Sequence, residues 1–344
     1  MSAPLSTLDL LKAQSGSPKA AADALDRKKR AAEANQTLTK AFSKSQLRWS
    51  NIDWIVTGFL VFIHLGCLAA FVPMFFSWQA LAVCAGMHWL TCSIGICLGY
   101  HRYLAHKALK LKPPAEFAVL LAGSLSGEGS PMTWAATHRI HHQKSDQEGD
   151  PHSPLQGAWW SHILWLFVHR KKEDQTLMWE KYIPELTKRP MLQFFEKTFA
   201  MWLWVQGLAL GAIGYAIDGW VLAASYVVWG MCVRMTMAYH STWFVNSATH
   251  LWGYRNYDTR DESRNLWWVA ILAYGEGWHN NHHAHPSVAP AGHKWWEVDI
   301  TWWSIRLLEM TGLAYDVRKK VPQGRKAADV EDAERQARAV EAVA

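Results

Sequence analysis

The chain has 344 residues, a net charge of +6 and 22 tryptophans, and half of its residues are apolar. Tryptophan at this density is unusual for a soluble protein, because the amphipathic indole favours membrane–water interfaces. The five cysteines lie in apolar stretches and form no CxxC pair, which excludes a disulfide framework as the basis of the fold.

The first 50 residues form a polar, basic arm that carries the run Arg27-Lys28-Lys29-Arg30. It contains no continuous apolar core, so it is not a secretory signal. One four-residue basic run is too little to indicate nucleic-acid binding, and we expect an arm that is solvated or touches lipid head groups. At the other end, residues 321–344 are expected to form a polar C-terminal tail.

Four apolar stretches follow the arm, and each meets the requirement of roughly 20 mostly apolar residues for a membrane span. They cover residues 54–76, 80–99, 199–217 and 220–239. The stretches form two pairs, joined near Ser77 and at Asp218-Gly219. The sequence therefore predicts two transmembrane hairpins.

The two short connections contain no Lys or Arg, whereas the rest of the chain is rich in both. The positive-inside rule then places both termini and the long middle segment in the cytoplasm. We predict an all-α integral membrane protein in which residues 51–320 form one domain, with residues 100–198 and 240–320 as a cytosolic helical cap. The alternative is a soluble helical protein with buried core helices.

Histidine motifs fall in the predicted cap. "HRYLAH" contains His101 and His106, and the HxxHH pattern occurs twice, in "HRIHH" and in "GEGWHNNHH". At this histidine content a random chain would contain HxxHH only about 0.04 times. On an α-helix, positions i, i+3 and i+4 share a face, so each HxxHH directs its imidazoles to one side. The HxxxxH pair would lie about 140° apart on an α-helix, and it needs a bend or a helix end.

These histidines indicate a metal centre, because neutral imidazole binds iron, zinc and copper. One zinc site uses four ligands, so the eight imidazoles of these three segments, with His250 of a fourth segment after the last predicted span as a ninth, indicate two metals. The carboxylate-rich di-iron pattern and HExxH are absent, which leaves a histidine-rich di-metal site with iron as the metal suited to oxygen chemistry. Three more histidines lie near the motifs and could orient ligands: His152, His240 and His285. The others are interpreted as ordinary polar groups: His64, His88, His162, His169 and His293.

The segments "HRYLAH", "HRIHH" with "GDPHSP", "TWFVNSATH" and "GEGWHNNHHAHP" resemble membrane fatty acid desaturases of the delta-9 (stearoyl-type) family. The resemblance runs from Trp54 to Lys319. It implies four transmembrane helices with a cytosolic cap, and a di-iron site in which Asn246 holds a water molecule. Its nine ligands would be His101, His106, His138, His141, His142, His250, His279, His282 and His283. Asp146, Asp150 or Glu276 could fix the tautomers of these rings.

The resemblance also implies an activity, the O2-dependent insertion of a cis double bond at the delta-9 position of a saturated acyl chain. Trp134, Thr242 and Trp243 match positions beside the bent acyl tunnel. The substrate would be an acyl-lipid or an acyl-CoA. No fused haem domain is present, so electrons would come from a separate ferredoxin- or cytochrome-type donor with its reductase. The wording of the motifs is most like bacterial members, which implies the bacterial inner membrane.

Two positions depart from the family pattern. Thr137 replaces an acidic residue found in acyl-CoA members, and Glu128 stands where a Gln is usual. Both leave the substrate head group open. The alternatives are a membrane di-iron hydroxylase or ketolase of alkyl, sterol or carotenoid substrates and, more distantly, a membrane metal-binding or transport protein.

Overall fold

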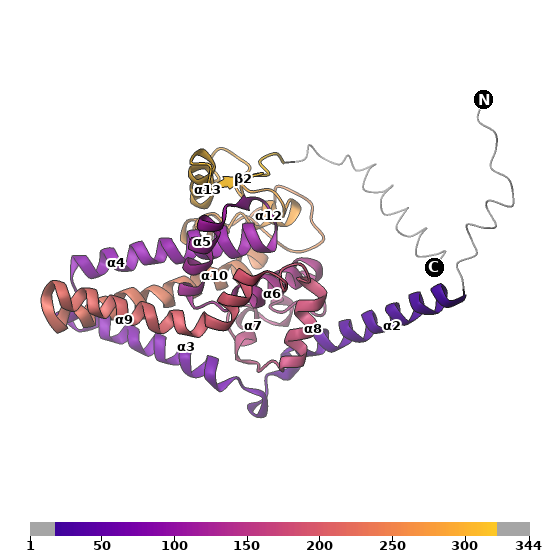
Figure 1. The fold of residues 1–344 in the computed structure, drawn as a ribbon, viewed down its shortest axis with the longest axis horizontal. Helices are drawn as coiled ribbons and strands as arrows, with labels where there is room; N and C mark the ends of the chain where they lie inside the picture. Colours follow the sequence, from indigo (N-terminus) through magenta and orange to yellow (C-terminus); the bar gives the residue numbers. More distant parts are fainter. Residues whose placement is uncertain (1–17, 322–344) are drawn as a thin grey trace.

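The computed structural model describes residues 18–321, so the predicted arm and tail lie partly outside the described residues. The described part is mostly helical (Figure 1). The α-helices of the first half are α2 (Pro18–Ala41), α3 (Trp54–Gly66), α4 (Trp78–His88), α5 (Pro113–Ser126), α6 (Pro131–Lys144), α7 (Ala158–His162) and α8 (Lys172–Tyr182). Those of the second half are α9 (Pro190–Val227), α10 (Arg234–Leu251), α11 (Trp267–Leu272), α12 (His279–Ala284) and α13 (Ile300–Met310).

Shorter elements connect these helices. Two π-helices, η5 (Trp89–Ala105) and η8 (Val228–Val233), continue α4 and precede α10 without a break in the chain direction. The 3-10 turns are Lys44–Gln46, Trp49–Asn51, Cys67–Phe71, Pro73–Phe75, Pro154–Gln156 and Leu164–Phe167. A two-stranded antiparallel sheet pairs β1 (Lys110–Leu111) with β2 (Ala314–Tyr315), and Lys110 lies opposite Tyr315.

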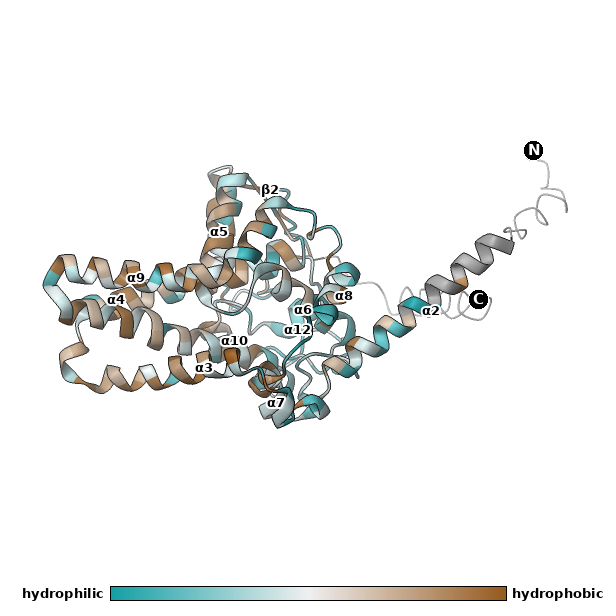
Figure 2. Ribbon diagram, turned by 60° about the horizontal axis from the view of Figure 1, so that its bottom comes forward, coloured by the Kyte–Doolittle hydropathy of each residue, from teal (hydrophilic) through white to brown (hydrophobic). Residues whose placement is uncertain are grey.

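Long apolar helices project to one side of the molecule, away from a more polar, compact part (Figure 2). Three helical segments of the described chain are long and apolar enough to cross a membrane: Trp54–Phe71, Trp78–Ala105 and Pro190–Leu251. Large apolar side chains on them face outward, among them Phe62, Trp204 and Leu208, each at least 67% exposed. We call these projecting helices the stem and the compact part the cap.

The third segment is 62 residues long and reverses direction within its length. Asp218 and Gly219 leave the helical region, and Gly219 has φ of 68°. After them the chain returns along itself so closely that a Cβ added to Gly214 would lie 2.7 Å from the carbonyl oxygen of Leu222. The reversal occurs at the predicted Asp218-Gly219 connection. In the first predicted span, regular α-helix ends at Gly66 and 3-10 turns continue to Phe75.

The cap packs around η5, which forms the C-terminal part of the second stem segment. Helix α5 packs tightly along η5, since a Cβ on Gly95 would lie 2.5 Å from the backbone of Ala122. A short turn after α5 leads into α6, which also contacts η5. Buried apolar residues from these helices and α13 form the main core, including Leu98, Leu120 and Ile140. The histidines of η5 and α6 are thereby brought together.

Candidate metal centre and substrate cavity

The nine histidines singled out in the sequence lie in two neighbouring groups, and within each group the potential ligand atoms are all within 4.8 Å of one another. The five-histidine group consists of His101, His106, His138, His142 and His282. The four-histidine group consists of His141, His250, His279 and His283. The two groups adjoin each other, because the ring centroid of His283 in the four-histidine group lies 4.4 Å from that of His142 in the five-histidine group.

Each HxxHH motif contributes to both groups. On α6, His138 and His142 join the five-histidine group, while His141 joins the other. On α12, His279 and His283 join the four-histidine group and His282 crosses to the first. The i and i+4 residues of a motif are thus a pair, and the i+3 residue points to the neighbouring site. The sequence predicted that the three imidazoles of one motif lie on one face of the helix. In the structure the rings on that face divide between two groups, which the spacing did not predict.

The predicted helix end between the HxxxxH pair is present, because η5 ends at Ala105 and His106 is its C-cap, and the helix type also brings the two residues together. His101 lies within the π-helix, and the backbone N–H of His106 donates to the carbonyl of His101 across 3.1 Å. A π-helix closes its turns with i→i+5 bonds, so residues five apart lie one above the other. The two rings are consequently 4.8 Å apart. Long π-helices are rare and often mark functional sites.

The nitrogens that face into the groups belong to imidazole rings, which bind transition metals in their neutral form. Facing Nε2 atoms are 3.0 Å apart for His101 and His282, and 3.1 Å apart for His250 and His279. Burial lowers the pKa of most rings well below the usual value, namely those of His106, His138, His142, His279 and His282. Metal-binding imidazole must be deprotonated. The donor set therefore fits a pair of imidazole-bound metals such as iron.

Carboxylates contact several of these rings at Nδ1, the ring nitrogen that does not face into the groups. The Nδ1 atoms of four rings face carboxylate oxygens at 2.7 to 3.0 Å, in the pairs His101–Glu276, His141–Asp150, His250–Asp146 and His283–Asp261. Such a contact keeps the proton on Nδ1 and turns Nε2 toward the group, and it raises the basicity of the ligand. Three of the four carboxylates were proposed for this role from the sequence.

Arg102 connects Glu276, the carboxylate partner of His101, to other residues of the cap. Its guanidinium lies 3.0 Å from Glu276 and 2.9 Å from Asp299, and it donates to the carbonyl of Ala289. Although burial favours the neutral carboxyl, His101 and Arg102 lower the pKa of Glu276 to about 2. Asp299 also accepts from the backbone of Trp302 and so caps α13. The orientation of His101 is thus coupled to a helix at the far edge of the cap.

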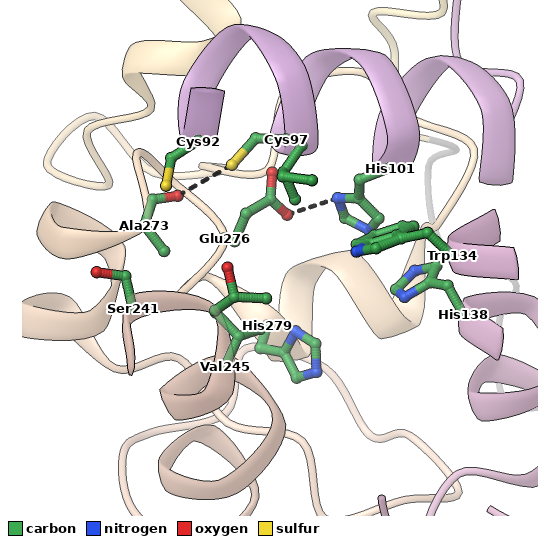
Figure 3. Close-up of a pocket in the computed structure, with 12 residues that line it drawn as sticks. Cys92, Cys97, His101, Trp134, His138, Ser241, Val245, Ala273, Glu276 and His279 are labelled. Carbon is green, nitrogen blue, oxygen red and sulfur yellow. Dashed lines mark hydrogen bonds and ion pairs between the residues drawn. The ribbon is translucent and has the colours of Figure 1, made fainter. Parts of the chain in front are cut away.

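A narrow cavity reaches both groups (Figure 3). Its walls are mainly apolar and come from η5, α10 and the segment before α12, with Ile96, Val245 and Ala273 among them. His101 and His138 of the five-histidine group border it, and so does His279 of the other group. A substrate in this cavity would therefore lie against both candidate metal positions.

Of the residues expected beside the acyl chain, Trp134 and Thr242 line this cavity. Trp134 stacks on His138 with ring centroids 5.0 Å apart, and the Thr242 hydroxyl donates to Glu128 across 2.9 Å. Trp243 is on the other side of α10, where it is buried and stacks on Tyr239 at 5.4 Å. Asn246 lies on α10 one turn before His250. A residue four positions away on an α-helix shares the same side.

Two residues of the centre escaped the sequence-based reasoning. Asp261 lies in the loop "DTRDESRN", where charged residues are so dense that none stands out. Arg102 lies inside the HRYLAH motif but carries no spacing signal of its own. The only hint was its position directly after a candidate ligand, in a stretch otherwise apolar.

Long apolar helices, two adjoining all-histidine groups that could hold metal ions and a shared apolar cavity fit a membrane enzyme that acts on an apolar substrate. Comparison with known proteins gives the family. The family model for fatty acid desaturases matches residues 76–318. The chain belongs to the fatty acid desaturase family, and it is an oxidoreductase that acts on fatty acyl chains.

Similar proteins in several organisms are named as desaturases of acyl-lipids or of acyl-CoA. The chain is 46% identical to the sn-2 palmitoyl-lipid 9-desaturase of Nostoc sp. (strain 36), over 81% of this chain and 93% of that protein. It is 43% identical to the sn-1 stearoyl-lipid 9-desaturase of Anabaena variabilis, over 78% and 94%. It is 38% identical to an acyl-CoA C20 Delta5-desaturase of Anemone leveillei, over 80% and 84%.

Proposed function

We propose that the chain inserts a cis double bond at the ninth carbon of a saturated acyl chain carried by a membrane lipid. Each turnover removes two hydrogens from the acyl chain and consumes O2, two electrons and two protons to give two waters. The cavity is the observation that carries the proposal, since His138 and His279 border it from the two groups. The names of the two cyanobacterial relatives support a 9-desaturase of lipid-bound chains.

The nine histidines would hold two irons, five rings at one position and four at the other. Asn246, one turn before His250, would hold a water at the four-histidine position. When bound, the irons supply the activated oxygen that breaks an unactivated C–H bond, which no side-chain acid or base can do. The all-imidazole donor set supports this assignment.

The protein itself positions the acyl chain in the cavity and keeps water out of it. Ile96, Val245 and Ala273 present apolar surface along the cavity and exclude water from the reacting methylenes. Trp134 covers one flank of His138 and limits where the chain can pass. A saturated chain offers many similar methylenes, so selection must come from the depth and shape of the cavity. The Thr242–Glu128 hydrogen bond fixes one side of that shape.

We propose that the stem crosses the membrane four times as two hairpins, with residues 54–76, 80–99, 199–217 and 220–239 as spans. Both termini and the cap would then lie in the cytoplasm at a bacterial inner membrane. The reversal at Asp218-Gly219 and the exposed apolar residues of the stem support two crossings within the third segment. Electrons would arrive from a separate ferredoxin- or cytochrome-type donor and its reductase.

Lipid analysis of a bacterial host tests this function. Cells that express the wild-type protein with a ferredoxin and its reductase should accumulate delta-9 monounsaturated chains in their glycerolipids. The variant His282→Ala should abolish the new double bonds, while His169→Ala, at a histidine exposed on the surface, should preserve them. Hydroxylated products without new double bonds would contradict the proposal, and unsaturation confined to acyl-CoA would contradict the lipid-bound substrate.

A further inference from the structure

The two histidine groups differ in the charge that lies behind their rings. In the four-histidine group, three of four rings face an aspartate: Asp150 at 3.0 Å, Asp146 at 2.9 Å and Asp261 at 2.8 Å. The three carboxylates are largely shielded from water, with side-chain exposures of 0%, 7% and 12%. Charge in such surroundings acts more strongly than charge in water.

The other hydrogen bonds of these carboxylates come from neutral donors. Asp150 accepts from the backbone N–H groups of Asp146 and His152. Asp146 accepts from the N–H of Glu262, and Asp261 accepts from the N–H of Ser263. These bonds keep the carboxylates ionised and in place but do not cancel their charge. The four-histidine position therefore lies among three negative charges.

The five-histidine group has charges that compensate one another. One carboxylate, that of Glu276, faces His101, and Arg102 lies 3.0 Å from it. The same guanidinium pairs with Asp299 at 2.9 Å. On the other side, Arg139 donates to the carbonyls of Leu104 and Ala105, next to His106. The acidic partner of Arg139 is Glu185, which Lys107 also contacts.

We propose that this difference in charge separates the reduction potentials of the two irons, with the lower potential at the four-histidine position. Negative charge stabilises the ferric state over the ferrous state, and a carboxylate behind an imidazole makes it a stronger donor to the ferric ion. The first electron then reduces the iron of the five-histidine group, and the second reduces the other. This inference rests on the proposed two-iron function, and it makes Asp146, Asp150 and Asp261 positioning and tuning residues.

Mössbauer spectroscopy of the full-length protein loaded with 57Fe tests the inference without any turnover. At half reduction the wild-type protein should show the ferric and ferrous signals of a mixed-valence pair, in a spectrum that is not the sum of the fully oxidised and fully reduced spectra. Asp261→Asn keeps an oxygen that can accept from His283 but removes a negative charge from the low-potential side. It should narrow the gap between the two potentials and lower the equilibrium constant for the mixed-valence state by about tenfold, because the charge lies nearer to one iron than to the other and acts in a partly buried site.

Glu276→Gln provides the opposite case. It removes negative charge from the high-potential side, so the gap should widen and the mixed-valence fraction should rise. Asp316→Asn, at an exposed carboxylate paired with Lys110, is the matched control and should leave the gap unchanged. Asp150→Asn repeats the first test at a fully buried position. Asp261 is the least buried of the three, so its variant remains informative if the Asp150 variant folds poorly.

Two results would overturn the inference. One is a wild-type protein in which both irons are reduced together. The other is a pair of variants, Asp261→Asn and Glu276→Gln, that shift the gap in the same direction or leave it unchanged. A protein that binds no iron contradicts the proposed function itself, so the two failures are distinguishable.

Discussion

Replacing Arg102 by methionine should destabilise the protein by about 3–5 kcal/mol, the cost of removing one partner from a buried ion pair. The arginine side chain is 3% exposed, and its guanidinium makes two hydrogen bonds to Glu276, two to Asp299 and one to the carbonyl of Ala289. Methionine has a similar length and fills much of the space. Most of the loss would therefore come from leaving two buried carboxylates without a cation.

A second substitution separates charge from packing. Asp299→Asn removes one of the two negative charges, and asparagine caps helices about as well as aspartate, so α13 keeps its cap. The double variant Arg102→Met/Asp299→Asn should be more stable than Arg102→Met alone by at least about 1 kcal/mol. Chemical unfolding in a single detergent, followed by tryptophan fluorescence, measures both differences. Additive losses in the double variant would refute the argument from uncompensated charge.

Three further predictions concern other parts of the molecule. Gly275→Ala should destabilise the cap by at least about 1 kcal/mol, because Gly275 has φ of 118° and a Cβ there would lie 2.8 Å from Cγ of Asp299. The control variant Gly58→Ala should not destabilise the protein, because the space around Gly58 is open. Equal losses of stability in the two variants would contradict the reasoning. Burial raises the pKa of Glu128 from 4.5 to about 7, so the folded protein binds this proton more tightly than the unfolded chain does. The free energy of unfolding should therefore fall as the pH rises from 4.5 to about 7. Glu128→Gln should lose less stability across that range, and an unchanged pH profile would contradict the assignment. A reporter fused after Ser77 should be accessible only from outside the cell, whereas a reporter fused after residue 320 should be accessible only from the cytoplasm. If both reporters were accessible from the same side of the membrane, the two-hairpin topology would be wrong.

The histidine spacing in the sequence predicted that the rings of one motif lie close together, because spacing is a local property of a helix. The chain spacing of His138, His141 and His142 puts them on one face of α6, and the structure brings them to the other six rings. The allocation of each ring to one of two sites depends on how α12 lies relative to α6, which is a tertiary property. The i, i+4 pairs and the crossing i+3 residues could not have been assigned from spacing alone.

Other features depended on packing that no short pattern records. The π-helical turn that aligns His101 with His106 lies in an apolar sequence that reads equally well as an α-helix. Asp261 reaches His283 from a loop whose path is set by distant contacts. The turn at Asp218-Gly219, in contrast, was predictable because a glycine after a short polar residue interrupts a long apolar stretch.

Iron content is the most direct test of the claim that nine imidazoles hold a pair of irons. After anaerobic reconstitution and removal of loose metal, the purified wild-type protein should retain about two iron atoms per chain. His282→Ala and His250→Ala remove one ligand from each group, and each should lower the affinity for one iron by about 10–100-fold or more, as loss of even an outer partner does. His285→Ala, outside both groups, should still retain both irons. A wild-type protein without iron, or full retention in both ligand variants, would contradict the account.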